Sequence, residues 1–269
     1  MKKSGLVIAL AFGVSSAFAQ DLTSKKGEPI LPEAGDWSIG IDATPFLTYA
    51  GGFLSGAGAT APTMGFFGGT NAILGKKFID EKTAYRGGLR LGIGSSKSTA
   101  IVADLSTGAA ATATVNNVTK GSGTAIALTA GKEYRKGKTR LQGYYGAEAG
   151  ILLNTGKTTY TYGNAASTMT IGTSRNTEVK SGATFGLGAR AFIGAEYFIF
   201  PKMAIGGEFG WGLALSTTGE GQTVSESWDG TKTTQTTVKT GKSSSFIIDT
   251  DNNNSMFGPA AAIHLSLHF

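Results

Sequence analysis

Two histidines, His264 and His268, are the first candidates for acid–base chemistry because the chain holds no others. Ser266 lies between them, and a serine beside a histidine is the pair that nucleophilic hydrolases use. In an extended segment all three side chains point to the same face. No third residue stands out that would orient the imidazole, so the triad is incomplete. We therefore predict a protein that is not an enzyme.

Metal and cofactor sites are not predicted either. The chain has no cysteine, so it offers no thiolate ligand and no disulfide. His264 and His268 are four residues apart, which is about 13 Å along a strand and too far for one ion. Gly92-Ile93-Gly94 and Gly186-Leu187-Gly188 lack the Lys-Ser/Thr that completes a phosphate-binding loop. We expect no cofactor.

Charged residues of both signs alternate with apolar residues along several segments. By strand alternation they share one face, and the apolar residues take the other. The charged face comprises Asp42, Lys77, Arg86, Arg90, Glu133, Arg140, Glu148, Arg190, Glu196 and Glu208. A buried charge is costly unless it is paired and hydrogen bonded. The pattern therefore predicts an interior ion-pair network made by Asp42, Arg86, Arg90, Glu133, Arg140, Glu148, Arg190, Glu196 and Glu208.

Two other uses of this face remain open. The arginines and glutamates could exchange partners in a polar pore or gate, or the interior could hold a small ligand. Interior glycines such as Gly206 and Gly210 would either leave room for water or allow close packing around bulky arginines, Tyr144 and Phe192.

Alternating segments predict the elements that position these charges. Eight strands are expected, at about 37–44, 70–79, 85–93, 125–135, 140–151, 185–197, 203–215 and 261–269. On the second of them the alternation places Ala72, Leu74 and Phe78 outside and Lys77 inside. Short connections are expected at about 80–82, 136–138 and 200–202, and long ones at about 48–69, 95–124, 154–181 and 216–256. This asymmetry is typical of bacterial outer-membrane barrels, with periplasmic turns and extracellular loops.

The long connections are rich in Thr, Ser, Gly and Asn and carry little apolar area of their own. Thr-rich runs such as 231–237 also have high β-propensity, so some strands could extend past the membrane as hairpins.

Composition is consistent with an all-β chain. Its 41 glycines follow no triplet period, which excludes collagen. The 24 basic residues exceed the 18 acidic ones only mildly and are scattered, so no nucleic-acid partner is expected.

The N-terminus predicts export. Lys2 and Lys3 precede a short apolar run, and Ala17-Phe18-Ala19 is a small-x-small cleavage site, so we assign residues 1–19 to a signal peptide. Residues 20–34 follow as an N-terminal leader that could lie extended in the periplasm, tuck into the base of a barrel or bind a periplasmic partner. Beyond residue 20 no long apolar run follows, and among membrane proteins only a closed barrel then satisfies the backbone in lipid.

The last strand ends on an aromatic residue with apolar residues at every second position before it, Ile263, Leu265, Leu267 and Phe269. This ending resembles the C-terminal strand of bacterial outer-membrane barrels, and the resemblance implies recognition by the barrel assembly machinery. Residues 35–269 as a whole resemble the small OmpA/OmpX-like barrels. The resemblance implies an eight-stranded antiparallel up-and-down transmembrane β-barrel in the bacterial outer membrane, in contact with its lipid and lipopolysaccharide.

Three functions are compatible with such a barrel. The first is a non-catalytic, plugged barrel that displays long loops for surface interaction or assembly with other envelope proteins. The second is a narrow channel for ions or small polar solutes. The third, most remote, is a lipid-modifying outer-membrane enzyme.

Overall fold

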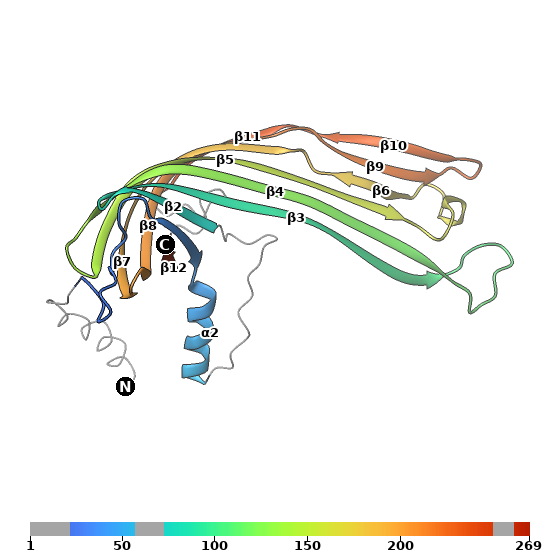
Figure 1. Cartoon of the computed structure of the whole chain (residues 1–269). Coiled ribbons are helices and arrows are strands. Elements are labelled where there is room, and N and C mark those ends of the chain that lie inside the picture. The colour runs from blue at the N-terminus through green and yellow to red at the C-terminus, as the bar shows by residue number, and fades with distance from the viewer. Residues whose placement is uncertain (1–21, 57–72, 250–260) are drawn as a thin grey trace, which may run out of the picture.

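The structure is a computed structural model that describes residues 22–56, 73–249 and 261–269. The predicted signal peptide, residues 1–19, lies outside the described residues. Twelve strands in the described ranges belong to one antiparallel sheet, where the sequence predicted eight (Figure 1). The elements are β1 (Trp37–Asp42), α2 (Thr44–Ser55), β2 (Ile73–Asp80), β3 (Thr83–Ala103), β4 (Thr114–Lys136), β5 (Leu141–Thr161), the 3-10 turn η1 (Ala166–Thr168), β6 (Ser174–Lys180), β7 (Thr184–Phe200), β8 (Met203–Thr218), β9 (Gly221–Trp228), β10 (Thr233–Thr240), β11 (Ser243–Asp249) and β12 (Ala261–His268).

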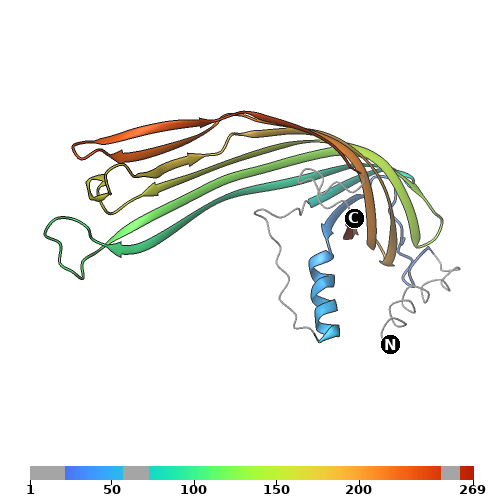
Figure 2. The same cartoon turned by 180° about the vertical axis from the view of Figure 1, so that it is seen from behind.

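At one end the sheet returns on itself through a circuit of strand pairs. β2, β3, β4 and β5 pair in sequence, and β7 pairs with both β5 and β8. β12 then pairs with β8 and β1, and β1 pairs with β2. Figures 1 and 2 show these strands curling together around the C-terminus. Each member of the circuit therefore has a hydrogen-bonded neighbour on both sides, which removes the exposed edge.

Three strands continue far beyond this circuit. β3, β4 and β5 have 21, 23 and 21 residues, whereas a tilted strand of about 9–11 residues crosses a membrane. Their far halves pair onward with β6, β9 and β10 into the long curved blade of Figure 1. Much of the predicted loops 95–124, 154–181 and 216–256 is thus strand, because Thr- and Ser-rich segments find β partners there.

β8 has two successive neighbours on one of its sides. β11 pairs with its far end, where Ser243 lies opposite Thr218, and β12 pairs with its near end, where Leu267 lies opposite Met203. On the other side β7 accompanies β8 along its length. The eighth predicted strand therefore has a second strand, β11, in line with it.

The helix α2 occupies part of the first predicted loop and follows directly after the C-terminal end of β1. It begins with a proline in its first turn and ends at Gly56, whose φ of 68° suits the left-handed cap. Phe53 and Leu54 are 74% and 84% exposed. No helix in the described ranges has the length and hydropathy needed to cross a membrane.

The circuit turns apolar side chains outward and charged ones inward. On β3, Tyr85, Leu91 and Ile93 are 58%, 54% and 71% exposed, whereas Arg86 and Arg90 between them are buried. Soluble proteins show the opposite arrangement. From Tyr85 to Ile93 this apolar belt spans about 26 Å along the strand. Beyond it Ser95, Lys97 and Thr99 occupy the outward positions before Ile101, which is 72% exposed.

The second predicted strand faces the other way from the prediction. In β2, Lys76 and Phe78 are buried inside, whereas Ile73 and Ile79 are 53% and 45% exposed. Lys77, predicted inside, lies outside with its Nζ 4.4 Å from the centre of the Trp37 ring. A shift of one residue in register reverses every side chain of a strand, so the error changed the whole segment.

Candidate functional site

The interior of the circuit holds two compact groups of ion pairs. The first, here called the lower square, contains Lys76, Glu133, Arg135 and Glu196. Lys76 Nζ lies 2.9 Å from Glu133 Oε2 and 2.7 Å from Glu196 Oε1. Arg135 binds the same two carboxylates, at 2.8 Å to Glu133 Oε1 and 2.7 Å to Glu196 Oε2. Each charge thus has two partners of opposite sign.

The second group, the upper square, repeats this pattern with Arg86, Glu148, Arg190 and Glu208. Arg86 Nη1 lies 2.7 Å from Glu208 Oε2, and its Nε lies 3.1 Å from Glu148 Oε2. Arg190 Nη2 lies 2.8 Å from Glu148 Oε1 and also contacts Glu208. A longer contact of 3.8 Å between Arg86 and Glu133 joins the two squares.

The squares balance their charge internally. Each has two cations and two carboxylates, and all eight side chains are at most 9% exposed. Removing these charges from water carries a large desolvation cost, which only close, multiply hydrogen-bonded pairing can offset. The partners come from β2, β3, β4, β5, β7 and β8, so the network connects opposite walls of the circuit.

Aromatic rings fill the space around the squares. The Tyr144 ring lies 4.7 Å from Lys76 Nζ, and the Phe192 ring lies 3.9 Å from the Arg86 guanidinium carbon. Cations attract the faces of such rings, which adds to the electrostatic balance. Glycines make room for this packing: a Cβ at Gly210 would lie 2.7 Å from Arg190 Cδ, and a Cβ at Gly194 would overlap the Tyr144 ring. These glycines therefore accommodate bulky neighbours.

An apolar layer closes the base below the lower square. Ile30 of the N-terminal leader is fully buried against Phe198 and Ala204. His268 belongs to this layer, with its ring centre 5.3 Å from that of Phe198 and 5.5 Å from that of Phe78. Within the described part of the leader, Ile30 thus packs at the base of the circuit, whereas most residues of 22–29 are exposed.

Lys202 fixes this base at its edge. Its Nζ lies 2.7 Å from Asp36 Oδ2, its N–H donates to Ile30 O at 3.0 Å, and its carbonyl accepts from the His268 N–H at 2.7 Å. Burial disfavours the ionised form of Asp36, but the hydrogen bond from Lys202 and one from the Glu33 N–H outweigh it. The pKa of Asp36 is consequently lowered.

The predicted network residues fall into three positions. Six of them form ion pairs in the squares: Arg86, Glu133, Glu148, Arg190, Glu196 and Glu208. Arg90 is buried two inward positions beyond Arg86 on β3, and Asp42 is half-buried at the end of β1. Arg140 departs from the prediction, because its guanidinium donates to the carbonyls of Phe198 and Ile199 at 3.3 and 3.2 Å.

Sequence reasoning missed two members of the lower square. Arg135 lies on the same strand face as Glu133, so its inward direction was readable from the alternation. Lys76 was hidden by the reversed facing of β2. Without these two cations the lower square would consist of two carboxylates, so the shortage of positive partners was the signal that could have found them.

In this interior His264 contacts a carboxylate of the lower square. His264 Nε2 lies 3.1 Å from Glu196 Oε1 and is 5% exposed, so it extends the lower square. Ser266 is buried at the next inward position of β12. Among the described residues, no three His, Asp or Glu side chains gather in a geometry that could hold a metal ion.

The residues of the predicted assembly signal lie on the outward face of β12 and just after it. Ile263, Leu267 and Phe269 are 42%, 51% and 63% exposed, and Leu265 is half-buried. Phe269 exchanges two backbone hydrogen bonds with Trp37, of 2.7 and 2.9 Å. The last residue therefore completes the pairing of the final strand with the first.

Comparison with solved structures gives several matching chains. The outer membrane protein OprG from Pseudomonas aeruginosa matches with 12% identity and a TM-score of 0.30, over 89% of this chain and 98% of the OprG chain. No protein-family model matches the chain, and no curated protein matches it. A TM-score of 0.30 is too low to establish a common fold, and the strand pairing of this chain itself defines its architecture.

Proposed function

We propose that this protein is an integral β-barrel of the bacterial outer membrane, reached after signal-peptide-directed export. The membrane part is the eight-strand circuit of β1, β2, β3, β4, β5, β7, β8 and β12, as in OmpA/OmpX-like barrels. The inverted distribution of side chains carries this proposal: exposed apolar residues surround buried ion pairs. Only lipid makes such an apolar surface stable. In lipid, a closed barrel gives every backbone N–H and C=O group of its strands a hydrogen-bond partner.

Aromatic and lysine side chains support the direction of insertion. Near the base, Lys77 lies over Trp37 at 4.4 Å and Lys132 over Tyr134 at 5.1 Å. Aromatic rings favour the membrane interface, and lysines extend from there toward water. The base would then face the periplasm and the long blade the exterior, with the aromatic C-terminus offered to the barrel assembly machinery.

The lumen is proposed to be closed and non-catalytic. An eight-stranded barrel is only wide enough for side chains to fill it, and here the two squares, Tyr144, Phe192 and the Ile30 layer occupy the interior in succession. A narrow channel for ions or small polar solutes is the second candidate, favoured only by the chain of charges along the axis. A lipid-modifying enzyme remains the remote third.

The biological role then lies in the extracellular blade. β3 continues ten residues past Ile93, which adds about 33 Å beyond the belt. β10 is exposed along its whole length and pairs with β9 alone in the described sheet. Such a protruding polar sheet suits surface interaction or assembly with other envelope proteins.

Two measurements test this function. Membranes of producing cells, washed with alkaline carbonate, should retain the protein, and purification should require detergent; a chain soluble without detergent would end the proposal. In planar bilayers the parent protein should give no steady single-channel currents. Steady currents that are abolished by Arg90→Ala or Glu208→Ala would replace the plug with the channel.

A further inference from the structure

Four lysines lie together on the outward face of the sheet, just beyond the apolar belt. Lys97 of β3 is directly opposite Lys120 of β4, and Lys157 of β5 is directly opposite Lys180 of β6. All four are exposed, and they share the outward face with Ile93. These four residues are called the lysine row.

The lysine row lies at a defined height above the belt. Lys97 is four residues beyond Ile93, and Lys157 is four residues beyond Leu153. Four residues advance a strand by about 13 Å, or about 9 Å in height at a tilt of roughly 45°. The polar headgroup region extends about 5–7 Å from the hydrocarbon core, so lysine side chains that bend toward the membrane reach it from this height.

The charges of the row are poorly balanced within the protein. Like charges directly opposite each other on paired strands destabilise a sheet, and the row contains two such pairs. Lys157 Nζ lies 2.9 Å from Glu178 Oε2. Glu178 also interacts electrostatically with Lys180, and among the described side chains no salt bridge joins Lys97, Lys120 or Lys180 to a carboxylate. The group of four lysines and one glutamate therefore carries a net charge of +3. An external anion would relieve this repulsion.

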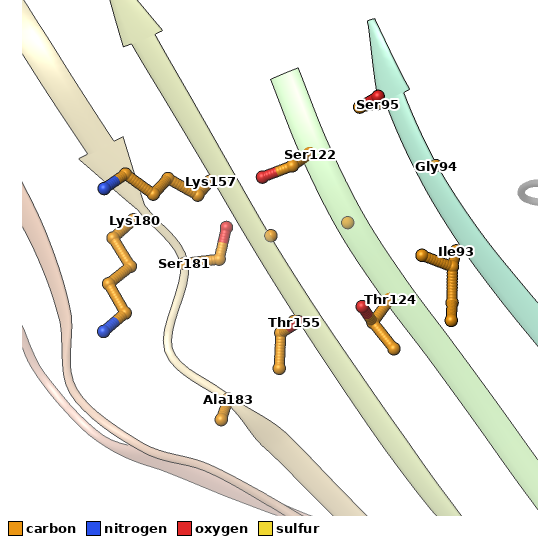
Figure 3. A pocket seen from close by; sticks show the side chains of 12 residues that line it. Ile93, Gly94, Ser95, Ser122, Thr124, Thr155, Lys157, Lys180, Ser181 and Ala183 are labelled. Carbon is orange, nitrogen blue, oxygen red and sulfur yellow. The ribbon is translucent and has the colours of Figure 1, made fainter. Parts of the chain in front are cut away.

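The surface between the lysines is hollowed and lined by hydroxyl groups. One hollow of about 410 Å³ has Lys157 and Lys180 on its rim, and Figure 3 shows both beside Ser122 and Ser181. Ile93 and Ala183 line the same hollow. A second hollow of about 510 Å³ lies between Lys97, Lys120 and Lys157. Ammonium and hydroxyl donors together are the groups that bind phosphate oxygens.

We propose that the lysine row binds the phosphorylated headgroup of an outer-leaflet lipid. The proposal rests on the membrane placement argued above. The position of the row commits the site to a lipid rather than to free phosphate, because its hollow opens onto Ile93 and the apolar belt continues below it. The acyl chains would lie against the belt while the phosphate groups occupy the hollows between the lysines.

The test uses the full-length protein in a neutral detergent, with native mass spectrometry to count retained lipid. The probes are bisphosphorylated lipid A, the same lipid after removal of its phosphates, and inorganic phosphate. The parent protein should retain bisphosphorylated lipid A and discriminate against its dephosphorylated form. Changing Lys97, Lys120, Lys157 and Lys180 to Gln should weaken retention by roughly 600-fold, because each of the four positive charges at an anionic headgroup contributes about a factor of five.

Two matched variants control for total charge and for folding. Replacement of four exposed lysines elsewhere, Lys82, Lys138, Lys232 and Lys242, by Gln removes the same charge and should leave retention unchanged. Replacement of the lysine row by Arg keeps its charge and should preserve retention. Heat-modifiable migration on gels reports whether each variant still forms its barrel.

The outcomes separate this inference from the proposed function. If the glutamine variant of the row forms its barrel and still discriminates between the two lipids, the lysine row is not the site. Competition by inorganic phosphate at concentrations equal to those of lipid A would make it a free-phosphate site and overturn the lipid assignment. If the parent protein needs no detergent, the membrane placement itself is wrong.

Discussion

Replacing Lys76 with Met tests the lower square most directly. Lys76 is 6% exposed, and its ammonium contacts both Glu133 and Glu196. The substitution keeps an unbranched side chain of similar length and deletes the charge. Two carboxylates would then face the single guanidinium of Arg135 in a buried site, leaving one uncompensated negative charge. Breaking a buried pair in this way costs about 3–5 kcal/mol of unfolding free energy.

A second substitution shows whether the cost comes from charge balance. Glu196→Gln alone removes one carboxylate and leaves a surplus positive charge, so it should also destabilise by several kcal/mol, of the order of 3. The double variant again has one cation and one carboxylate in the square. Its cost should therefore fall short of the sum of the single costs by about 1–3 kcal/mol.

Urea unfolding of the protein in lipid vesicles, followed by tryptophan fluorescence and by gel mobility, measures these differences. Lys239→Met is the matched control, since Lys239 is 72% exposed and pairs with Glu220 at 3.4 Å. It should unfold like the parent, because exposed ion pairs contribute little. The reasoning is refuted if Lys76→Met is as stable as Lys239→Met, or if the two single costs in the square simply add.

Three further predictions concern the base and the closure of the circuit. Deleting Phe269 removes its two backbone hydrogen bonds with Trp37 and the terminal aromatic, so the amount of heat-modifiable barrel in membranes should fall; normal amounts would contradict this. Ile30→Ala should lower the unfolding free energy by about 2–5 kcal/mol, whereas Ile30→Val should cost about 0.5–1.5; equal costs would show that the leader does not pack as described. Asp36→Asn should destabilise at pH 7 and lose its effect in acid. The lowered pKa of Asp36 makes its stabilisation present above the unfolded value of about 3.9 and absent once the pH falls through the folded value, so a pH-independent difference in urea unfolding would exclude the contact with Lys202.

The facing of most strands was predictable because their two faces differ clearly in polarity. On β3 the arginines at 86 and 90 alternate with Tyr85, Leu89 and Leu91. Only one assignment of the two faces therefore puts the charged residues on one side and the apolar residues on the other. On β2 the adjacent pair Lys76 and Lys77 gives a charge to either face. Phe78 and Leu74 then suggested that the even positions face outward.

The inward face of β2 was predicted wrongly because each face of this strand carries both a lysine and apolar residues. Phe78 is buried inside because the base layer is apolar and aromatic, formed with Phe198 and His268. Lys77 is stable on the outward face because its ammonium lies over the Trp37 ring and donates to Gly35 O at 3.1 Å. Neither the base layer nor the aromatic support can be read from the strand alone.

The blade was less predictable than the circuit. Beyond Ile93 small polar residues and Lys97 occupy both faces of β3 as far as Thr99, and the apolar Ile101 and Val102 then fall on opposite faces, so no alternation marks the strand, and its register is set by its partner β4. The possibility of hairpins past the membrane was readable from threonine content, but the order β5, β6, β9 and β10 was not. Pairing between distant segments leaves no local signal in a polar sequence.

The arrangement of the squares bears on how a closed lumen could open. Every carboxylate in them is held by two cations, and every cation by two carboxylates, so moving one side chain breaks at least two buried contacts. The lower square ties β2, β4 and β7 together, and the upper square ties β3, β5, β7 and β8. His264 adds β12 through Glu196, and Phe269 with Trp37 adds β1. Partner exchange along this network would therefore loosen several walls at once, and for this reason the closed state is favoured over a gate.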